Sequence, residues 1–447
     1  MRDLLLIIII VGSVPVCLIS PFYGVMMWYW VSYFNPHRFT WSYGYDFPVA
    51  LLVAVPTLIG TVFAQKSIRS LFMRESILLI CIWAWYAFTY IHAQEIPFFT
   101  LHMPDAKYEI NHISKILLMT LVMIAVITTR VKLRGVMLVT ALSLGLLAVK
   151  GMLFGLRTGG ESRVWGPPDS FLADNNAFGL ALNMCLPLLF FLAQDEKNKW
   201  LKLLLRVCFA ASILSVILTY SRGGLLGLGV VLAAITLKSR HRLIGGVLLT
   251  ASIFVVFTLA PSAWMSRMSQ FMSGDLDASA NQRLVAWETA WQFAKDYPVT
   301  GGGFDTLPDV NVFQHYQLKP LPLGYTSTGP HSIYFQLLSD QGFVGLGLFL
   351  LLIASCFWTL WRIRRTARIL GSSQWLVNYA NMVEIAILGF MVSGAFLGFL
   401  YLDVIYQMIA SVVVLKTIFQ KEVTAHLGKL EEERSAVGYS EPQPALA

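Results

Sequence analysis

The sequence is poor in charged residues. Only 13% of its 447 residues are Asp, Glu, Lys or Arg, whereas 56% are hydrophobic. Soluble domains carry roughly 25% charged residues, so this shortage argues against an ordinary water-soluble enzyme. The mean hydropathy of +0.64 agrees with that conclusion and indicates a chain that lies largely in lipid.

Motifs of several common enzyme classes are also missing. The sequence has no Walker A lysine motif, no H-E-x-x-H and no G-x-S-x-G in a strand context, so nothing supports those chemistries. The run GGGFDT lacks the β-α-β surroundings of a dinucleotide fingerprint. The acidic residues that we expect outside the membrane show no spacing diagnostic of a glycosidase: Asp169, Asp174, Asp275, Asp277, Asp305 and Asp309.

The five cysteines form no metal-ligand pattern. Each lies inside or beside an apolar run, and none falls in the large polar loop described below. Cysteines in such places usually act as small core hydrophobes. We interpret all five as packing residues: Cys17, Cys81, Cys185, Cys208 and Cys356.

Long apolar runs dominate the chain instead. A helix needs about 20 apolar residues to cross a bilayer, and by this criterion the chain has about twelve candidates. They are 4–22, 47–65, 75–93, 115–129, 135–155, 177–194, 201–219, 223–237, 243–260, 333–355, 380–398 and 400–418. The start, MRDLLLIIII, lacks a convincing cleavage site and is interpreted as a retained helix, and MMWYW near Trp28 as a further short or interfacial element. We predict an all-α, polytopic integral membrane protein.

The net charge of +8 follows this topology rather than nucleic-acid binding. Basic residues cluster in alternate short loops, which the positive-inside rule places in the cytoplasm. The clusters are Lys66, Arg69 and Arg74; Arg130, Lys132 and Arg134; Lys197, Lys199 and Lys202; Lys238, Arg240 and Arg242; and Arg362, Arg364, Arg365 and Arg368. Both termini are then cytoplasmic, and the outside loops are about 23–46, 94–114, 156–176, 220–222, 261–332 and 399–400.

Three regions follow from this topology. They are an N-terminal membrane half at 1–199, a second membrane region at 200–420 that includes the outer loop 261–332, and a disordered cytoplasmic tail at 421–447. Loops of such length are usually functional or disordered. The outer loop is expected to be ordered, because it contains a predicted helix. Asp277 or Ser279 would be the N-cap of this helix, and the three glycines at 301–303 would follow its end. One apolar stripe on the helix would lie on the bilayer surface. The stripe comprises Leu284, Trp287, Trp291 and Ala294.

A few polar residues in this setting are candidates for chemistry. Arg222 lies in TYSRGGLLGLG between two apolar segments, so it must snorkel, pair with an acid or bind an anion. Gly223 and Gly224 permit a tight turn, and the following helix N-terminus also favours anions. Arg283, by spacing alone, fits a solvated surface charge equally well.

Several external arginines could together hold a diphosphate. A guanidinium offers two parallel hydrogen bonds that match phosphate, and Arg157 and Arg163 lie in the outer loop before WGPPDSFLADNN. His331 precedes an apolar helix, where it could cap or could take a proton from a hydroxyl at near-neutral pH. His315 is a weaker candidate because nothing around it suggests a constrained site.

Four motifs in one order carry a family resemblance. TYSRGGLLGL is followed by R-L-x-x-W-x-x-A from Arg283 to Ala290, then YPVTGGGF, then HSIYFQLLSDQGFVGL. Over about residues 200–355 this order resembles the O-antigen ligase and polymerase superfamily. The N-terminal half, with NPHRFTWSYGYDFP and WGPPDSFLADNN, is similar to a branch of O-glycosylation ligases associated with exosortase systems. Where many members have His-Asn, this chain has His331-Ser332, so no Asn amide follows the histidine.

The resemblance implies a glycosyltransferase of the bacterial inner membrane with a periplasmic active site. It would transfer a preassembled glycan from undecaprenyl diphosphate to lipid A-core, with inversion and without a metal ion or other cofactor. Arg222 and Arg283, with Arg163 as a further contributor, would bind the diphosphate. His331 would activate or orient the acceptor hydroxyl. The implied partners are the lipid-linked donor, the acceptor and membrane lipids, with no nucleic acid.

Two alternatives remain open at this stage. The same donor chemistry could serve a protein hydroxyl, as in a protein O-glycosylation ligase, or another sugar chain, as in an O-antigen polymerase. A transporter of lipid-linked glycans would carry charges inside its spans along a central path, whereas here most charges lie at helix ends.

Overall fold

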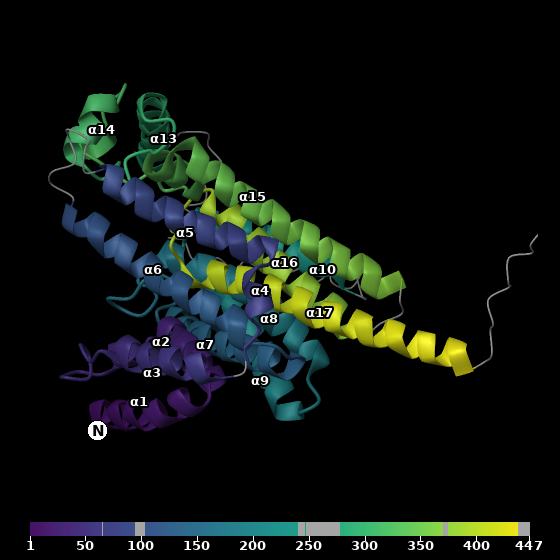
Figure 1. Ribbon diagram of the computed structural model, residues 1–447. Coiled ribbons are helices and arrows are strands. Elements are labelled where there is room, and N and C mark those ends of the chain that lie inside the picture. Colours follow the sequence, from purple (N-terminus) through teal and green to yellow (C-terminus); the bar gives the residue numbers. More distant parts are fainter. Residues whose placement is uncertain (65, 94–102, 240–245, 247–277, 370–373, 437–447) are drawn as a thin grey trace, which may run out of the picture.

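The protein is a bundle of helices. The computed structural model describes residues 1–447 except 65, 94–102, 240–245, 247–277, 370–373 and 437–447. Every regular element among the described residues is helical (Figure 1), which confirms the all-α prediction. The long helices are α1 (Arg2–Ile19), α2 (Pro21–Phe34), α3 (Val49–Phe63), α5 (Arg74–Ala93), α6 (Met103–Val126), α7 (Arg130–Arg157), α8 (Asn175–Asp195), α9 (Lys199–Leu218), α10 (Arg222–Lys238), α13 (Ala278–Asp296), α15 (Ile333–Ile369), α16 (Gln374–Gly394) and α17 (Asp403–Ala436). Short helical turns are η1 (Pro36–Phe39), α4 (Ile68–Leu71), α14 (Val310–Tyr316) and η3 (Pro322–Gly324).

Nine helices in the described part of the chain are long and apolar enough to cross a membrane: α1, α5, α6, α7, α8, α9, α15, α16 and α17. Two other predicted spans are shorter, because α3 has 15 residues and α10 has 17. The predicted span 243–260 falls almost wholly outside the described residues. The fold is therefore that of a multi-pass membrane protein, and the count of about twelve spans stays a prediction.

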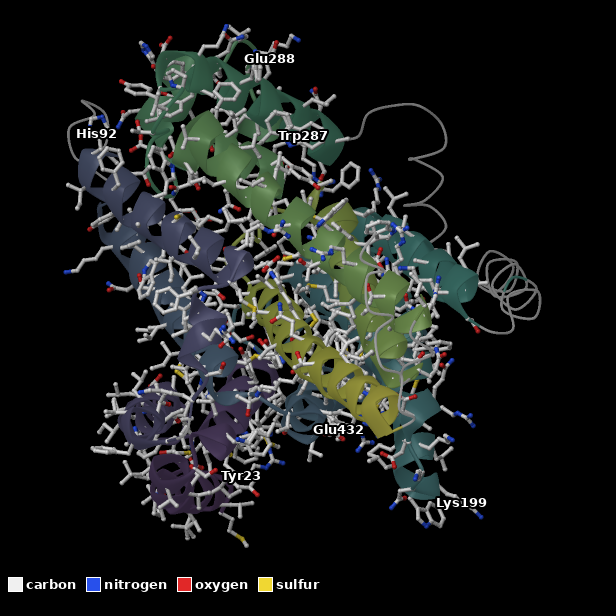
Figure 2. All side chains as sticks on the ribbon, turned by 45° about the vertical axis from the view of Figure 1, so that its right-hand side comes forward. Tyr23, His92, Lys199, Trp287, Glu288 and Glu432 are labelled. Atoms are coloured by element: carbon white, nitrogen blue, oxygen red, sulfur yellow. The ribbon has the colours of Figure 1, made fainter. Side chains whose placement is uncertain are left out.

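Basic segments gather at one end of the bundle, as the topology prediction requires. Arg134 at the start of α7 pairs with Glu196 before α9. Arg130 lies over the Trp375 ring at the start of α16, 4.8 Å from its centroid. We call this the basic end. In Figure 2, Lys199 and Glu432 lie at this end, and His92, Trp287 and Glu288 lie at the opposite one.

The N-terminus lies at the end opposite the basic end, which corrects the prediction that both termini share one side. The Asp3 carboxylate accepts hydrogen bonds from the backbone N–H groups of Ser42 and Gly44, both at 3.1 Å. Near them, the Tyr45 hydroxyl donates to Asp169 in the outer loop. In contrast, α17 begins at the same end and runs toward the basic end (Figure 1).

The cause of this difference is α2. Ser20 and Pro21 break the first apolar run, because proline is favoured at a helix start but cannot continue the helix before it. The chain then returns along α1 as a 14-residue helix, shorter than the usual length of a span. The aromatic stretch around Trp28 lies in this helix and packs inward. One added traverse moves the N-terminus to the other end.

The centre of the bundle is formed by α8, α16 and α17. Their residues are buried on all sides, among them Phe178, Phe390 and Tyr406. A helix that is hydrophobic all round belongs inside a bundle. The Asp174 side chain caps α8 by accepting hydrogen bonds from the N–H groups of Asn176 (2.8 Å) and Ala177 (3.1 Å). The start of α8, the end of α16 and the start of α17 therefore lie beside the segments that form the candidate site.

A buried ion pair fastens three helices near the basic end. The Glu75 side chain on α5 is fully buried, and its Oε2 lies 2.8 Å from Lys416 Nζ on α17. Its Oε1 accepts hydrogen bonds from Thr359 (2.7 Å) and Ser355 (3.0 Å) on α15 and lies 2.9 Å from Arg74. Since the partners belong to different helices, this cluster sets how α5, α15 and α17 pack.

We expect Glu75→Ala to destabilise the protein by about 3–5 kcal/mol, because it leaves a lysine without its partner in a buried position. Thermal unfolding of the purified protein in detergent measures the effect, with the exposed Glu161→Ala as the matched control. Equal unfolding temperatures for Glu75→Ala and the wild type would show that the cluster contributes no stability.

Candidate active site

Arg222 stands at a tight turn between α9 and α10. Ser221 caps α10, since its hydroxyl accepts a hydrogen bond from the N–H of Gly224 at 3.0 Å. Tyr220 adopts a left-handed backbone with φ of +59°. The Asn175 side chain at the start of α8 donates to the Thr219 carbonyl at 2.8 Å. These bonds hold the turn and leave the half-buried Arg222 as the first residue of α10.

The outer loop before α8 brings Arg163 close to this turn. The N–H of Val164 donates to the Leu218 carbonyl at 2.9 Å, and the Tyr220 hydroxyl donates to the Gly160 carbonyl. Burial raises the pKa of Tyr220, Glu161 adds to the rise, and the charge of Arg163 opposes it. Arg163 therefore acts electrostatically on the residue two positions before Arg222. Arg157 ends α7 and is exposed.

Helix α13 carries Arg283 to the same end of the bundle (Figure 1). One turn after Arg283, the Trp287 indole donates to the Pro330 carbonyl at 2.8 Å and stacks on Phe335 with centroids 5.1 Å apart. The Gln282 side chain donates to the Thr328 hydroxyl at 3.0 Å. Helix α13 is thereby fixed to the segment that precedes His331.

The predicted apolar stripe on α13 is only partly correct. Ala294 is buried and Trp287 is half-buried, but Leu284 and Trp291 are 44% and 48% exposed. The buried face of α13 consists instead of Val285, Ala286, Ala290 and Phe293. The exposed pair is compatible with a helix at a lipid surface. The predicted caps of α13 were Asp277, which lies outside the described residues, and Ser279, which lies inside the helix that begins at Ala278.

His331 has a constrained conformation beside a cavity. Its φ is +46°, in the left-handed region that non-glycine residues seldom adopt. Its Nε2 lies 3.4 Å from the Thr328 hydroxyl. Burial lowers the pKa of His331, Arg283 lowers it further, and Asp174 opposes the change. Since α15 begins at Ile333, His331 is not the residue next to the helix that would cap it.

The cavity beside His331 has a volume of about 290 Å³. It lies between the start of α8, the start of α15 and the segment joining α16 to α17. Its wall includes Asp174, Asp305, His331, Gln336, Asp340 and Phe399. Both Arg283 and Asp174 lie close enough to the imidazole to act on it electrostatically.

A break in α15 shapes this cavity. Gly342 has φ of +67° and ψ of −174°, so the helix is interrupted there. The glycine run packs on the break: the N–H of Gly302 donates to the Ser339 carbonyl (2.8 Å) and that of Gly303 to the Asp340 carbonyl (2.7 Å). A Cβ on Gly301 would lie 2.6 Å from the Gly342 nitrogen. The glycines at 301–303 thus permit close backbone approach.

The remaining candidates lie elsewhere or serve structural roles. His315 on α14 is exposed and is not among the residues that line the cavity. Asp309 caps α14, with its carboxylate accepting from the N–H groups of Asn311 and Val312. Asp275 and Asp277 lie outside the described residues. Among the residues that the structure describes, no group of three His, Cys, Asp or Glu side chains has the arrangement of a metal site.

Asp340 and Gln336 are cavity residues that we did not predict. Asp340 carries a carboxyl group within an apolar segment, and it is only 2% exposed. The signal was present in the sequence, because a carboxyl group inside an apolar helix is costly and usually has a function. It was overlooked because the predicted span 333–355 was treated as one uninterrupted membrane helix.

Two family models match the chain. Residues 207–350 match a family described as O-Antigen ligase, and residues 1–197 match a family of unknown function (DUF5935). No curated protein matches. The first match includes Arg222, Arg283, His331 and the break at Gly342, whereas Arg163 lies in the second. The chain therefore contains a region, residues 207–350, that matches the O-antigen ligase family, which supports the predicted resemblance to the O-antigen ligase and polymerase superfamily.

Proposed function

We propose that this protein is a membrane glycosyltransferase that moves a preassembled glycan from undecaprenyl diphosphate to lipid A-core. The observation that carries the proposal is the gathering of Arg222, Arg283 and His331 at one end of the bundle, within the O-antigen ligase match. If the basic end faces the cytoplasm, this site faces the periplasm of a bacterial inner membrane.

The arginines would hold the donor diphosphate. Arg222 begins α10, so a phosphate beside it would also lie at the positively polarised N-terminus of a helix. Arg283 approaches from α13, and Arg163 lies near the same turn. Guanidinium groups bind phosphate oxygens through paired hydrogen bonds. They would stabilise the charge that develops on the leaving diphosphate as the bond to the sugar breaks.

His331 would receive the acceptor proton. The acceptor oxygen attacks the anomeric carbon, a new C–O bond forms, and the bond from that carbon to the diphosphate oxygen breaks with both electrons leaving on the diphosphate. The hydroxyl proton passes to the imidazole. Attack opposite the leaving group inverts the anomeric configuration. The lowered pKa of His331 keeps its ring neutral near pH 7, in the form that can accept a proton.

Donor binding would then strengthen this base. Arg283 contributes to the low pKa of His331 in the free protein. A bound diphosphate would offset the positive charge of Arg283, because its negative charges lie beside the guanidinium. The imidazole would therefore gain basicity when the donor is present. None of these steps requires a metal ion, and we propose a metal-independent reaction.

The pH dependence of transfer follows from the direction of this shift. Neutral His331 is the active form in this proposal, and its pKa lies below the ordinary 6.5. The kcat/KM for the donor should therefore stay constant as the pH is lowered to 6.5. It should then fall as the pH drops through the lowered pKa. Initial transfer rates at low donor concentration across pH 4.5–8 measure this profile. An acid limb centred above 6.5 would contradict the assignment.

The identity of the acceptor is tested by mass analysis of the reaction products. Purified protein with undecaprenyl-diphosphate glycan is offered lipid A-core, a Ser/Thr-containing polypeptide or a second glycan chain, and mass analysis shows which molecule gains the glycan. We expect lipid A-core to gain it. Transfer to polypeptide or glycan alone would indicate an O-glycosylation ligase or a polymerase with the same donor chemistry. Movement of intact donor across vesicles without bond cleavage would indicate a transporter instead.

A further inference from the structure

The wall of the cavity beside His331 is acidic rather than basic. Asp174, Asp305 and Asp340 line it, whereas none of the three candidate arginines is among its lining residues. Carboxylates would repel a diphosphate at close range. The donor headgroup is therefore better placed beside the arginines than in this cavity. The cavity, at about 290 Å³, is left for a neutral group with hydroxyls, and its volume suits a small polar ligand.

Asp340 differs from the other two carboxyl groups in the hydrogen-bonding capacity that it has available for a ligand. Asp174 already caps α8. Asp340 is 2% exposed, and its Oδ1 accepts hydrogen bonds from the Thr306 N–H at 3.1 Å and the Ser339 hydroxyl at 3.5 Å. Both of these hydrogen bonds fall on Oδ1. Because Asp340 is almost fully buried and lines the cavity, its carboxyl group can accept a further hydrogen bond from a ligand that enters the cavity.

The backbone holds this carboxyl in place. The N–H of Gly303 donates to the Asp340 carbonyl, and two residues later the helix breaks at Gly342. Thr306, which fixes Oδ1, belongs to the same glycine-rich segment. Both the main chain and the side chain of Asp340 are therefore held by residues 303–306. Such support pre-organises a binding group, so it need not be ordered when the ligand arrives.

We propose that Asp340 positions a sugar acceptor. Its Oδ2 accepts a hydrogen bond from one hydroxyl of the acceptor sugar, while a second hydroxyl of that sugar faces His331, which lines the same cavity. Asp340 takes part in no bond making or breaking. The inference rests on the proposed function and deepens it, since it requires an acceptor with at least two hydroxyls on one ring. A serine or threonine side chain does not meet that requirement.

Asp340→Asn tests the proposal with the least disturbance. Asparagine keeps an oxygen for the Thr306 N–H but places an amide N–H₂ where Oδ2 was. We expect kcat/KM for the acceptor to fall about 10- to 100-fold, while KM for the donor stays within about twofold. The control is Asp296→Asn, which removes an exposed carboxylate on α13 outside the cavity and should change neither constant. Thermal unfolding checks that each variant folds.

Acceptors that each lack one hydroxyl give a second test, which needs only the wild-type protein. At least one of them should lose about tenfold in acceptor kcat/KM, and with Asp340→Asn the same acceptor should lose little more. An unchanged acceptor kcat/KM in Asp340→Asn, or equal rates for all deoxy acceptors, would overturn the proposal. So would a raised donor KM with acceptor constants unchanged, which would assign the cavity to the donor sugar. A wild-type protein that transfers glycan to no acceptor would instead overturn the proposed function itself, and this inference with it.

Discussion

Arg283→Ala is expected to lower glycan transfer by at least about 100-fold, because it removes a donor that stabilises negative charge on the leaving diphosphate. Arg283 lies on α13 close enough to lower the pKa of His331, so in the proposed reaction its charge would act near the bond that breaks. Arg222→Ala should have an effect of the same size. Arg163→Ala should lower the transfer rate by a smaller factor, since the charge of Arg163 acts on the turn at Tyr220 from the neighbouring loop.

Lysine variants separate charge from geometry. Arg222→Lys and Arg283→Lys keep the charge but lose the planar fork, so we expect partial activity between that of the alanine variants and the wild type. Arg157→Ala is the control, because Arg157 is exposed at the end of α7 and is not among the residues that line the cavity. Initial rates with purified, folded variants measure these effects. Wild-type rates in both Arg222→Ala and Arg283→Ala would remove the arginines from the mechanism.

His331→Ala is expected to slow transfer between about 100- and 10,000-fold, the usual range for loss of a general base. Undecaprenyl diphosphate without glycan should still bind, since the proposed diphosphate ligands are unchanged. The protein should still fold, because within the described part of the chain the imidazole's hydrogen bonding is limited to a long contact with Thr328.

His331→Asn distinguishes a base from a hydrogen-bond donor. Asparagine tolerates the left-handed backbone that His331 adopts and can donate a hydrogen bond, but it cannot take up a proton. If His331 is the base, His331→Asn should be as slow as His331→Ala. Recovery of much of the activity by asparagine alone would show that the ring donates to the diphosphate instead.

Much of the site could be predicted because its parts lie in short motifs. Arg222 stood out since an arginine between two apolar runs is costly, and His331 stood out since it directly precedes an apolar helix. The order of four motifs joined them to Arg283. What the sequence could not show is that these motifs meet, because the contacts run through Trp287, Pro330 and residues 395–402, which no local pattern connects.

The failures have equally local causes. Helix α2 has 14 residues and begins at Pro21, so a criterion based on span length did not count it as a traverse and placed the N-terminus at the wrong end. The break at Gly342 lies within an apolar run, and hydropathy alone does not register a left-handed glycine. Asp340 was missed for the same reason. The stripe on α13 was only partly correct, because Leu284 and Trp291 are exposed as expected at a lipid surface, whereas Ala294 is buried and Trp287 half-buried.

One measurement tests the central claim most directly. Purified wild-type protein is incubated with undecaprenyl-diphosphate glycan and lipid A-core in the presence of EDTA, and both the glycosylated product and the released undecaprenyl diphosphate are quantified. The account predicts that the two appear in equal amounts and that His331→Ala yields neither at a comparable rate. Intact donor after incubation with lipid A-core, polypeptide and glycan acceptors alike, or product formed equally by His331→Ala, would contradict it.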